Sequence, residues 1–366
     1  MPFLYSSPIT NKNRCINIED FLKSYDINKY TLILDTNICI YLENYFLDPL
    51  KTIDNWKKNN DLETLIDFFD MIKFINKFKI SYNIDQALNE SCRDIFNNYT
   101  LNISKFVKRV DCIEYILSDL PLSQVLYPTS NFQTDNNLDF LEEIMEPLFK
   151  SIDLPFITTN LIMSYICVLK IKQLADDRKQ KNYEKLRSYF QFITKKLDFI
   201  SLAHLGVAIL IFGGFRLSNG KGMESLIHVK KKKKLSKRDS YIHGLWNAAT
   251  DLAWVVNVCR EIEYDKIPIF VTNDRALNEV MTRYIVNPNI KEHGNAPILA
   301  AFDYSNVKFD IEYEKELKKL EKELNTFQNK NLLHRRLKLL EGIENDTILN
   351  RFLTIKQELE NYLPSH

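Results

Sequence analysis

Two short apolar runs along the chain each end in a polar triplet that contains an aspartate. Tyr30–Leu34 is mostly apolar with β-branched members, and Asp35-Thr36-Asn37 follows it directly. Ile267–Val271 is a second such run, and Thr272-Asn273-Asp274 follows it. Short apolar runs bounded by polar residues are typical of buried strands, so we predict a strand at each place.

Most of the rest of the chain carries apolar residues at helical spacing. Such segments are expected at 61–79, 84–96, 106–117, 138–149, 161–175, 183–197, 199–211 and 245–263. Strands that alternate with helices indicate an α/β fold with a parallel sheet, and ligands bind at the carboxyl edge of such a sheet.

Three aspartates fall where this fold would bring them together. Asp35 and Asp274 follow the two strands, and Asp251 lies in the helical segment that precedes the second strand. Taken alone, Asp35 or Asn37 is equally well explained as a cap of the next helix. Three carboxylates near one sheet edge can also converge on a divalent cation, which prefers oxygen ligands.

These motifs resemble those of the PIN-domain nucleases. The matching stretches are LILDTN (32–37), TDLAWVV (250–256) and IFVTNDRAL (269–277), together with an acid on a helix after the first strand. The resemblance covers residues 30–110 and 240–310. It implies a PIN-like parallel sheet flanked by helices, with four acids that hold Mg²⁺ or Mn²⁺ and hydrolyse phosphodiester bonds.

The resemblance also assigns roles to individual residues. Asp35, Glu90, Asp251 and Asp274 are the expected catalytic and metal-binding acids, with Asp94 as the alternative to Glu90. Asn37 and Thr272 would fix the geometry of a carboxylate or a water. Asn247 lies four residues before Asp251, and His243 four before that, so all three share a helical stripe; we expect Asn247 to support the site.

The resemblance divides the chain into five segments. They are an irregular lead-in (1–29) with a short helix near 18–24, two halves of the PIN-like core (30–110 and 230–310), a large helical insertion (111–229) and a helical C-terminal tail (311–366). The tail has a partial apolar seam, from Leu317 to Leu340, that suggests a helical hairpin or a pairing surface for a second copy or a protein partner.

A basic run precedes the helix of Asp251. Its cationic residues are Lys230, Lys231, Lys232, Lys233, Lys234, Lys237 and Arg238. Such runs are commonly solvated loops. Because this one leads straight into a helix with a candidate metal ligand, we expect it to grip the phosphates of a nucleic acid, RNA in preference to DNA.

Composition limits the remaining function classes. The 366 residues carry a net charge of only +1, so a nucleic-acid surface must be local. The six cysteines form no Cys-x-x-Cys pair, which favours buried thiols and a cytoplasmic location. The start has no charged segment followed by a long apolar core, so no signal peptide is expected. Phe199–Phe215 is a candidate membrane span, but its paired glycines favour a buried helix, and no membrane partner is expected.

The sequence therefore favours a Mg²⁺- or Mn²⁺-dependent endoribonuclease. The main alternative is a catalytically silent PIN-like scaffold that binds RNA or protein. A phosphatase of the haloacid-dehalogenase type would need an aspartate at the position of Asn37, and a dinucleotide-binding protein would need a glycine-rich turn after Leu34.

Overall fold

The computed structural model describes residues 3–7, 27–95, 100–132, 155–231, 233, 235–257, 266–286, 300–329 and 347–364. The chain forms two compact units. The first comprises Met1–Ile152 and Val258–Leu299, and the second comprises Asp153–Asn257 and Ala300–His366.

The first unit is an α/β structure with a four-stranded mixed sheet. The strand order is β1 (Leu4–Ser6), β6 (Ile267–Thr272), β2 (Tyr30–Leu34) and β3 (Ser81–Asn83). β2 is parallel to both of its neighbours, and every residue of β2 is buried. Both predicted strands are confirmed, and they are direct neighbours with Leu34 opposite Val271.

β1 is a correction to the expected irregular lead-in. It pairs antiparallel with β6 at the edge of the sheet, with Leu4 opposite Thr272. A three-residue strand is too short to leave a periodic pattern, so only its partner reveals it. The short helix expected near 18–24 lies outside the described residues.

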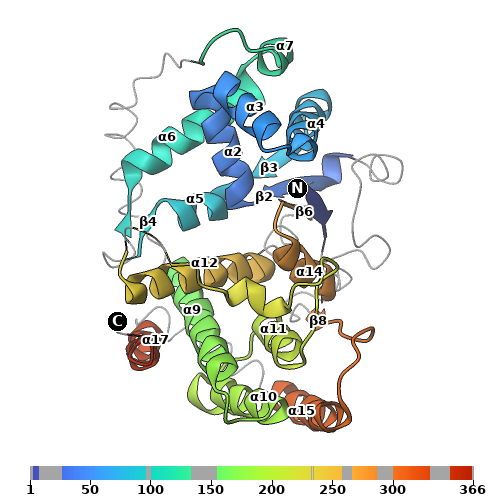
Figure 1. The fold of residues 1–366 in the computed structure, drawn as a ribbon, viewed down its shortest axis with the longest axis vertical. Coiled ribbons are helices and arrows are strands. Elements are labelled where there is room, and N and C mark those ends of the chain that lie inside the picture. Colours follow the sequence, from blue (N-terminus) through green and yellow to red (C-terminus); the bar gives the residue numbers. More distant parts are fainter. Residues whose placement is uncertain are drawn as a thin grey trace. The chain divides into compact units, whose positions relative to one another are not determined.

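Helices flank this sheet within the first unit (Figure 1). They are α2 (Thr36–Leu47), α3 (Pro49–Lys58), α4 (Leu62–Phe78), α5 (Asp85–Ser91), α6 (Ile103–Glu114), α7 (Leu122–Leu126) and α14 (Arg275–Arg283). α2 packs against α3, α5, α6 and β6, while α14 packs against β1 and β6. Short elements complete the unit: η1 (Ile27–Lys29), β4 (Arg93–Asp94), β5 (Thr100–Leu101), η2 (Tyr115–Asp119) and β7 (Tyr284–Val286).

The expected helix 84–96 is shorter than its pattern. α5 ends at Ser91, and the next residues form β4, which pairs antiparallel with β5. Glu90 therefore lies on a helix and Asp94 on a strand.

The second unit is built mainly of helices. Its elements are α9 (Pro155–Asp176), α10 (Asn182–Gln191), η3 (Phe192–Lys196), α11 (Leu202–Phe212), η4 (Met223–Ile227), α12 (Lys237–Asn257), β8 (Ala300–Phe302), α15 (Ile311–Asn329) and α17 (Thr347–Glu360). α9 packs against α10, α11, α12 and α17. The helices predicted at 161–175, 183–197 and 199–211 are confirmed, whereas 138–149 lies outside the described residues.

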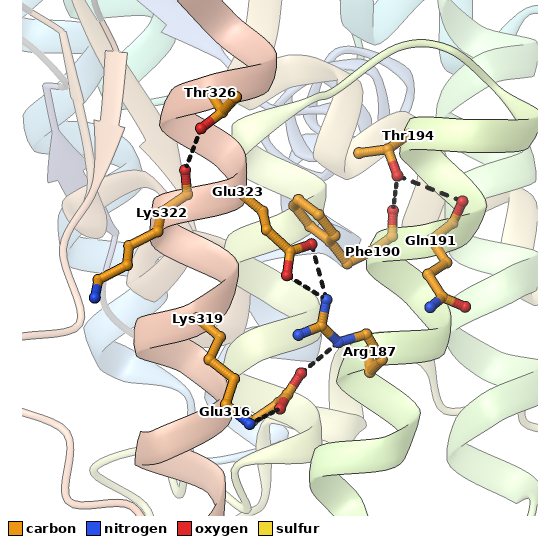
Figure 2. A network of polar contacts seen from close by, with 9 residues as sticks. All are labelled: Arg187, Phe190, Gln191, Thr194, Glu316, Lys319, Lys322, Glu323 and Thr326. Carbon is orange, nitrogen blue, oxygen red and sulfur yellow. Dashed lines mark hydrogen bonds and ion pairs between the residues drawn. The ribbon is translucent and has the colours of Figure 1, made fainter.

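The described helices of the C-terminal tail pack inside the second unit. α15 packs against α10, and α17 against α9. Leu317 and Leu320 of the apolar seam are buried there. An Arg187 network reinforces the contact of α10 with α15: Nε donates to Glu316, and Nη1 donates to both carboxylate oxygens of Glu323 at 2.7 and 2.8 Å (Figure 2). This part of the seam is therefore used within the chain and is not free to pair with another chain.

α12 belongs to the helical unit. The resemblance groups residues 230–257 with the sheet, but α12 packs on α9, α11 and η4, with Leu245, Ala249 and Leu252 buried. Ser164 of α9 ties it further by donating to the carbonyl of Ala249 at 2.5 Å. The two compact units thus divide the chain differently from the five expected segments.

The apolar segment at 199–215 forms the buried helix α11. All of its side chains from Ala203 to Phe212 are buried, and the helix ends at Gly213. Gly214 follows with a φ of 71°, a left-handed conformation that glycine adopts without strain. Among the helices of the described segments, none combines the length and the apolarity needed to cross a membrane.

Candidate metal centre

Asp35 stands at the junction of β2 and α2. Its backbone N–H donates to the carbonyl of Val271 at 3.0 Å, which continues the pairing of β2 with β6. Its own carbonyl accepts from the N–H of Cys39 at 3.0 Å, the first bond of α2. The strand and the helix together therefore hold this residue at the carboxyl edge of the parallel strands.

The carboxylate of Asp35 is only half satisfied. Oδ2 accepts from Thr272 Oγ1 at 2.7 Å and from Asn37 Nδ2 at 3.4 Å. Oδ1 is buried and has no hydrogen-bond partner among the described residues. A buried carboxylate oxygen without a donor is costly, so Oδ1 is suited to a positively charged ligand.

Burial also changes the acidity of Asp35, whose side chain is 1% exposed. Loss of solvation, opposed by the bond from Thr272 and reinforced by the negative charge of Asp274, raises the pKa of Asp35 to about 6. A bound cation would favour the ionised form and so reverse this shift.

Thr272 links the two aspartates that follow the strands. Its hydroxyl donates to Asp35 Oδ2 and accepts from the N–H of Asp274 at 2.9 Å. Asp274 in turn caps α14, because its Oδ1 accepts from the N–H groups of Ala276 and Leu277 at 2.7 and 3.0 Å. Both capping bonds use the same oxygen, so the cap does not occupy Oδ2.

Glu90 is the second acid of this site. Thr36 Oγ1 donates to Glu90 Oε2, which links α2 to α5. One carboxylate oxygen of Glu90 lies within 4.8 Å of one of Asp35, close enough for both to bind one ion. The alternative acid, Asp94, lies on β4 and is exposed.

Sequence reasoning did not anticipate two of these contacts. Thr36 was only part of a polar triplet, and its partner is 54 residues away. Asn273 donates to the hydroxyl of Tyr41 at 2.6 Å, a contact across 232 residues. In both cases the only signal in the sequence is a polar residue beside a strand-end aspartate.

The other predicted site residues lie in the second unit. Asp251 is half-buried on α12, and Asn247 is exposed one turn before it. The carbonyl of Asn247 accepts from Thr250 Oγ1 at 2.7 Å. Trp246 is buried, as expected for a core residue.

The described part of the basic run is open to solvent. Lys230, Lys231, Lys233 and Lys237 are exposed, and Arg238 is half-buried. Lys232 and Lys234 lie outside the described residues. The run thus presents at least four cations before and at the start of α12.

The residues present fit a hard divalent cation. Asp35 and Glu90 supply carboxylate oxygens, and Mg²⁺ or Mn²⁺ prefers oxygen ligands and retains several waters. The unpartnered Oδ1 of Asp35 is the atom that most requires such an ion. This acidic group is therefore able to hold a metal.

Comparison with known proteins does not extend the motif resemblance. No protein-family model matches the chain. No curated protein and no solved structure matches it either. Function must therefore be argued from the site itself.

Proposed function

We propose that this protein is a Mg²⁺- or Mn²⁺-dependent endoribonuclease. The observation that carries the proposal is the buried carboxylate of Asp35, with Oδ1 unpartnered and a Glu90 oxygen within 4.8 Å, at the carboxyl edge of parallel strands. In open α/β sheets this edge is where substrates bind.

The proposal gives each acid a task. Asp35 binds the ion through Oδ1, while Thr272 and Asn37 keep Oδ2 in place. Glu90, oriented by Thr36, binds the same ion or holds the attacking water. The PIN resemblance assigns Asp251 as a further carboxylate. Asp274 contributes directly through Oδ2 or through water, because its Oδ1 is engaged in capping α14.

The reaction is hydrolysis of a phosphodiester bond. When bound, the metal polarises the phosphate and lowers the pKa of a coordinated water. Water attacks phosphorus, the bond to the 3′-oxygen breaks, and the products carry a 5′-phosphate and a 3′-hydroxyl, as the PIN resemblance implies. The chain's own residues orient the carboxylates and exclude bulk water from Oδ1 of Asp35.

Substitution of the acids tests the proposal. Asp35→Asn should abolish Mg²⁺- or Mn²⁺-dependent cleavage of single-stranded RNA, because it removes the central ligand charge. Asp274→Asn should weaken cleavage less, since an asparagine still caps α14. Asp85→Asn is the matched control: Asp85 is an exposed acid at the same sheet edge and should leave cleavage unchanged.

The alternative, a silent scaffold, predicts a different outcome. Asp35→Asn and Asp274→Asn would then behave like the parent, with no metal-dependent cleavage of RNA or DNA in any variant. Preference for DNA over RNA would correct the substrate and leave the metal chemistry standing. Thermal unfolding of each variant separates loss of activity from loss of fold.

A further inference from the structure

A lysine precedes each of the three parallel strands. Lys29 comes before β2, Lys79 lies two residues before β3, and Lys266 comes before β6. The strand registers bring them to the same edge: Tyr30 is opposite Ile267 and Thr31 is opposite Ser81, and each lysine lies one or two residues before these paired positions. The three lysines therefore all lie at the amino edge of the sheet.

Three like charges thus stand at one edge of the sheet. Neighbouring strands lie about 4.8 Å apart, so the three backbones span only about 10 Å. Lys29 and Lys79 are exposed, and Lys266 Nζ donates to Ser81 Oγ at 2.9 Å. None of the ion pairs among the described residues involves these three lysines. Clustered cations without acidic partners favour an anionic ligand.

A cavity adjoins this lysine row. It has a volume of about 700 Å³ and lies between the end of α4 and the segment 118–122. Lys73, Lys77 and Lys79 line it, together with the polar side chains of Asn76 and Ser118. Asp119 also lines it, and Lys73 is paired with Asp70 at 2.9 Å. Lys77 and Lys79 therefore carry the cationic character of the cavity, and Lys79 joins it to the row.

The helix dipole explains only part of this arrangement. Lys77 and Lys79 lie at the C-terminus of α4, where the helix dipole favours cations. Lys29 ends the short 3-10 helix η1 and Lys266 directly precedes β6, and both lie at the same sheet edge as Lys79. The shared edge and the adjoining cavity point together to a ligand with several negative charges.

We propose that this amino-edge lysine row, Lys29, Lys79 and Lys266 with the adjoining cavity, binds backbone phosphates of a single-stranded nucleic acid. The choice of ligand rests on the proposed nuclease function. From Lys29 to Asp35 is six residues of extended chain, roughly 20 Å. The row therefore holds a part of the strand that lies away from the carboxylates, and it affects affinity without entering the chemistry.

The test measures binding without cleavage. Affinity for a labelled, unstructured single-stranded RNA is measured in EDTA at several salt concentrations. Each lost phosphate contact should flatten the slope of log affinity against log salt by about 0.7. Lys29→Gln with Lys79→Gln and Lys266→Gln should flatten it by up to roughly two. The matched control combines Lys51→Gln, Lys57→Gln and Lys58→Gln on α3, which remove the same charge from exposed positions in the same unit.

The outcomes are distinct. The proposal would be overturned if the triple variant of Lys51, Lys57 and Lys58 flattened the salt slope as much as that of Lys29, Lys79 and Lys266. It would also be overturned if the latter left the slope unchanged. If inorganic tripolyphosphate binds the row and RNA does not, the ligand is a small polyphosphate and the proposal is wrong. Replacement of the same lysines by Arg should retain the slope. Should loss of the Lys266 bond to Ser81 unfold the triple variant, Lys29→Gln with Lys77→Gln and Lys79→Gln tests the same row.

Failure of the nuclease proposal is separable from failure of this one. Cleavage depends on Asp35 and is scored in Mg²⁺, whereas the salt slope is scored in EDTA. A silent scaffold that still shows the flattened slope would retain the amino-edge lysine row as a nucleic-acid surface.

Discussion

Asp35 is fully buried, and one of its carboxylate oxygens has no hydrogen-bond donor among the described residues. Its protonation state therefore affects the free energy of unfolding. Its position at the end of a strand was predictable, because a buried parallel strand appears as a continuous apolar run and Asp35 directly follows such a run. Its incomplete hydrogen bonding was not predictable, because the donors Thr272 and Asn37 and the missing third donor are set by tertiary structure.

The pKa of about 6 predicts a pH dependence of stability in the metal-free protein. The folded protein keeps a proton on Asp35 that the unfolded chain, with a carboxyl pKa of 3.8, has already lost. The stability contribution is therefore complete below pH 3.8 and is lost as pH rises through about 6. The loss is on the order of 3 kcal/mol.

Comparison with Asp35→Asn isolates this effect. In EDTA, the difference in unfolding free energy between the variant and the parent should grow in favour of the variant from about pH 4 to pH 7. Denaturant titrations at each pH measure it, and Mg²⁺ should shrink it by binding only the folded parent. A difference that stays constant with pH would contradict the burial argument.

The bond from Thr36 to Glu90 is a second contact at residue scale that the sequence could not predict. Glu90 was the least constrained assignment, because an exposed helical glutamate is common and Asp94 shared its predicted face. The structure separates the two residues, since the helix ends at Ser91 and Asp94 falls on β4. Helix ends are hard to place from a pattern when no cap residue marks them.

At the scale of elements, the strongest patterns gave the best predictions. β2 and β6 are buried runs of five and six residues, and they are adjacent as expected. β1 has three residues and was missed. The packing of α12 on α9 could not be predicted, because an amphipathic pattern states that a helix packs but does not identify its partner.

A buried ion pair joins α2 to α6 and offers a prediction at this scale. Arg109 is 5% exposed, and its Nε and Nη2 donate to Glu43 Oε2. Glu43→Ala leaves this guanidinium buried without its partner, which should cost about 3–5 kcal/mol of unfolding free energy. Neither Glu43 nor Arg109 is a proposed metal ligand. Metal-dependent cleavage should therefore fall only as far as the folded fraction falls.

Asp70→Ala is the matched control for this prediction. Asp70 pairs with Lys73 on the exposed surface of α4, so its loss should cost under about 1 kcal/mol. Chemical denaturation of both variants measures the contrast. The double variant Glu43→Met with Arg109→Met should recover much of the loss, because well-packed apolar residues can replace a buried pair. Equal costs for Glu43→Ala and Asp70→Ala would show that the pair is not buried in solution.

At the scale of the whole molecule, a net charge of +1 conceals local separation of charge. In the first unit, aspartates follow the parallel strands and lysines precede them, so one sheet edge is acidic and the other basic. Both signals are present in the sequence, but lysines before strands have meaning only once the pairing of the strands is known. Composition alone gave no reason to expect either edge.

The basic run before α12 supplies the last prediction. Lys230, Lys231 and Lys233 are exposed, and α12 carries Asp251. If they grip phosphates, replacing all three with Gln should flatten the salt dependence of single-stranded RNA affinity by up to roughly two units of slope. Affinity should fall similarly for every RNA sequence, because phosphate contacts carry no base information. Cleavage at saturating RNA should persist, since no acid is changed.

Lys315, Lys318 and Lys322 of α15 provide the control for the basic run. They are exposed, belong to the same unit and remove the same charge when replaced by Gln. A general electrostatic effect would flatten the salt slope equally in both triple variants. If the basic run grips phosphates, the slope flattens only in the variant of Lys230, Lys231 and Lys233. An unchanged slope in the Lys230, Lys231 and Lys233 variant would show a solvated loop. The substrate contacts would then have to come from elsewhere, and flattening in the variants of Lys29, Lys79 and Lys266 would assign them to the amino edge of the sheet.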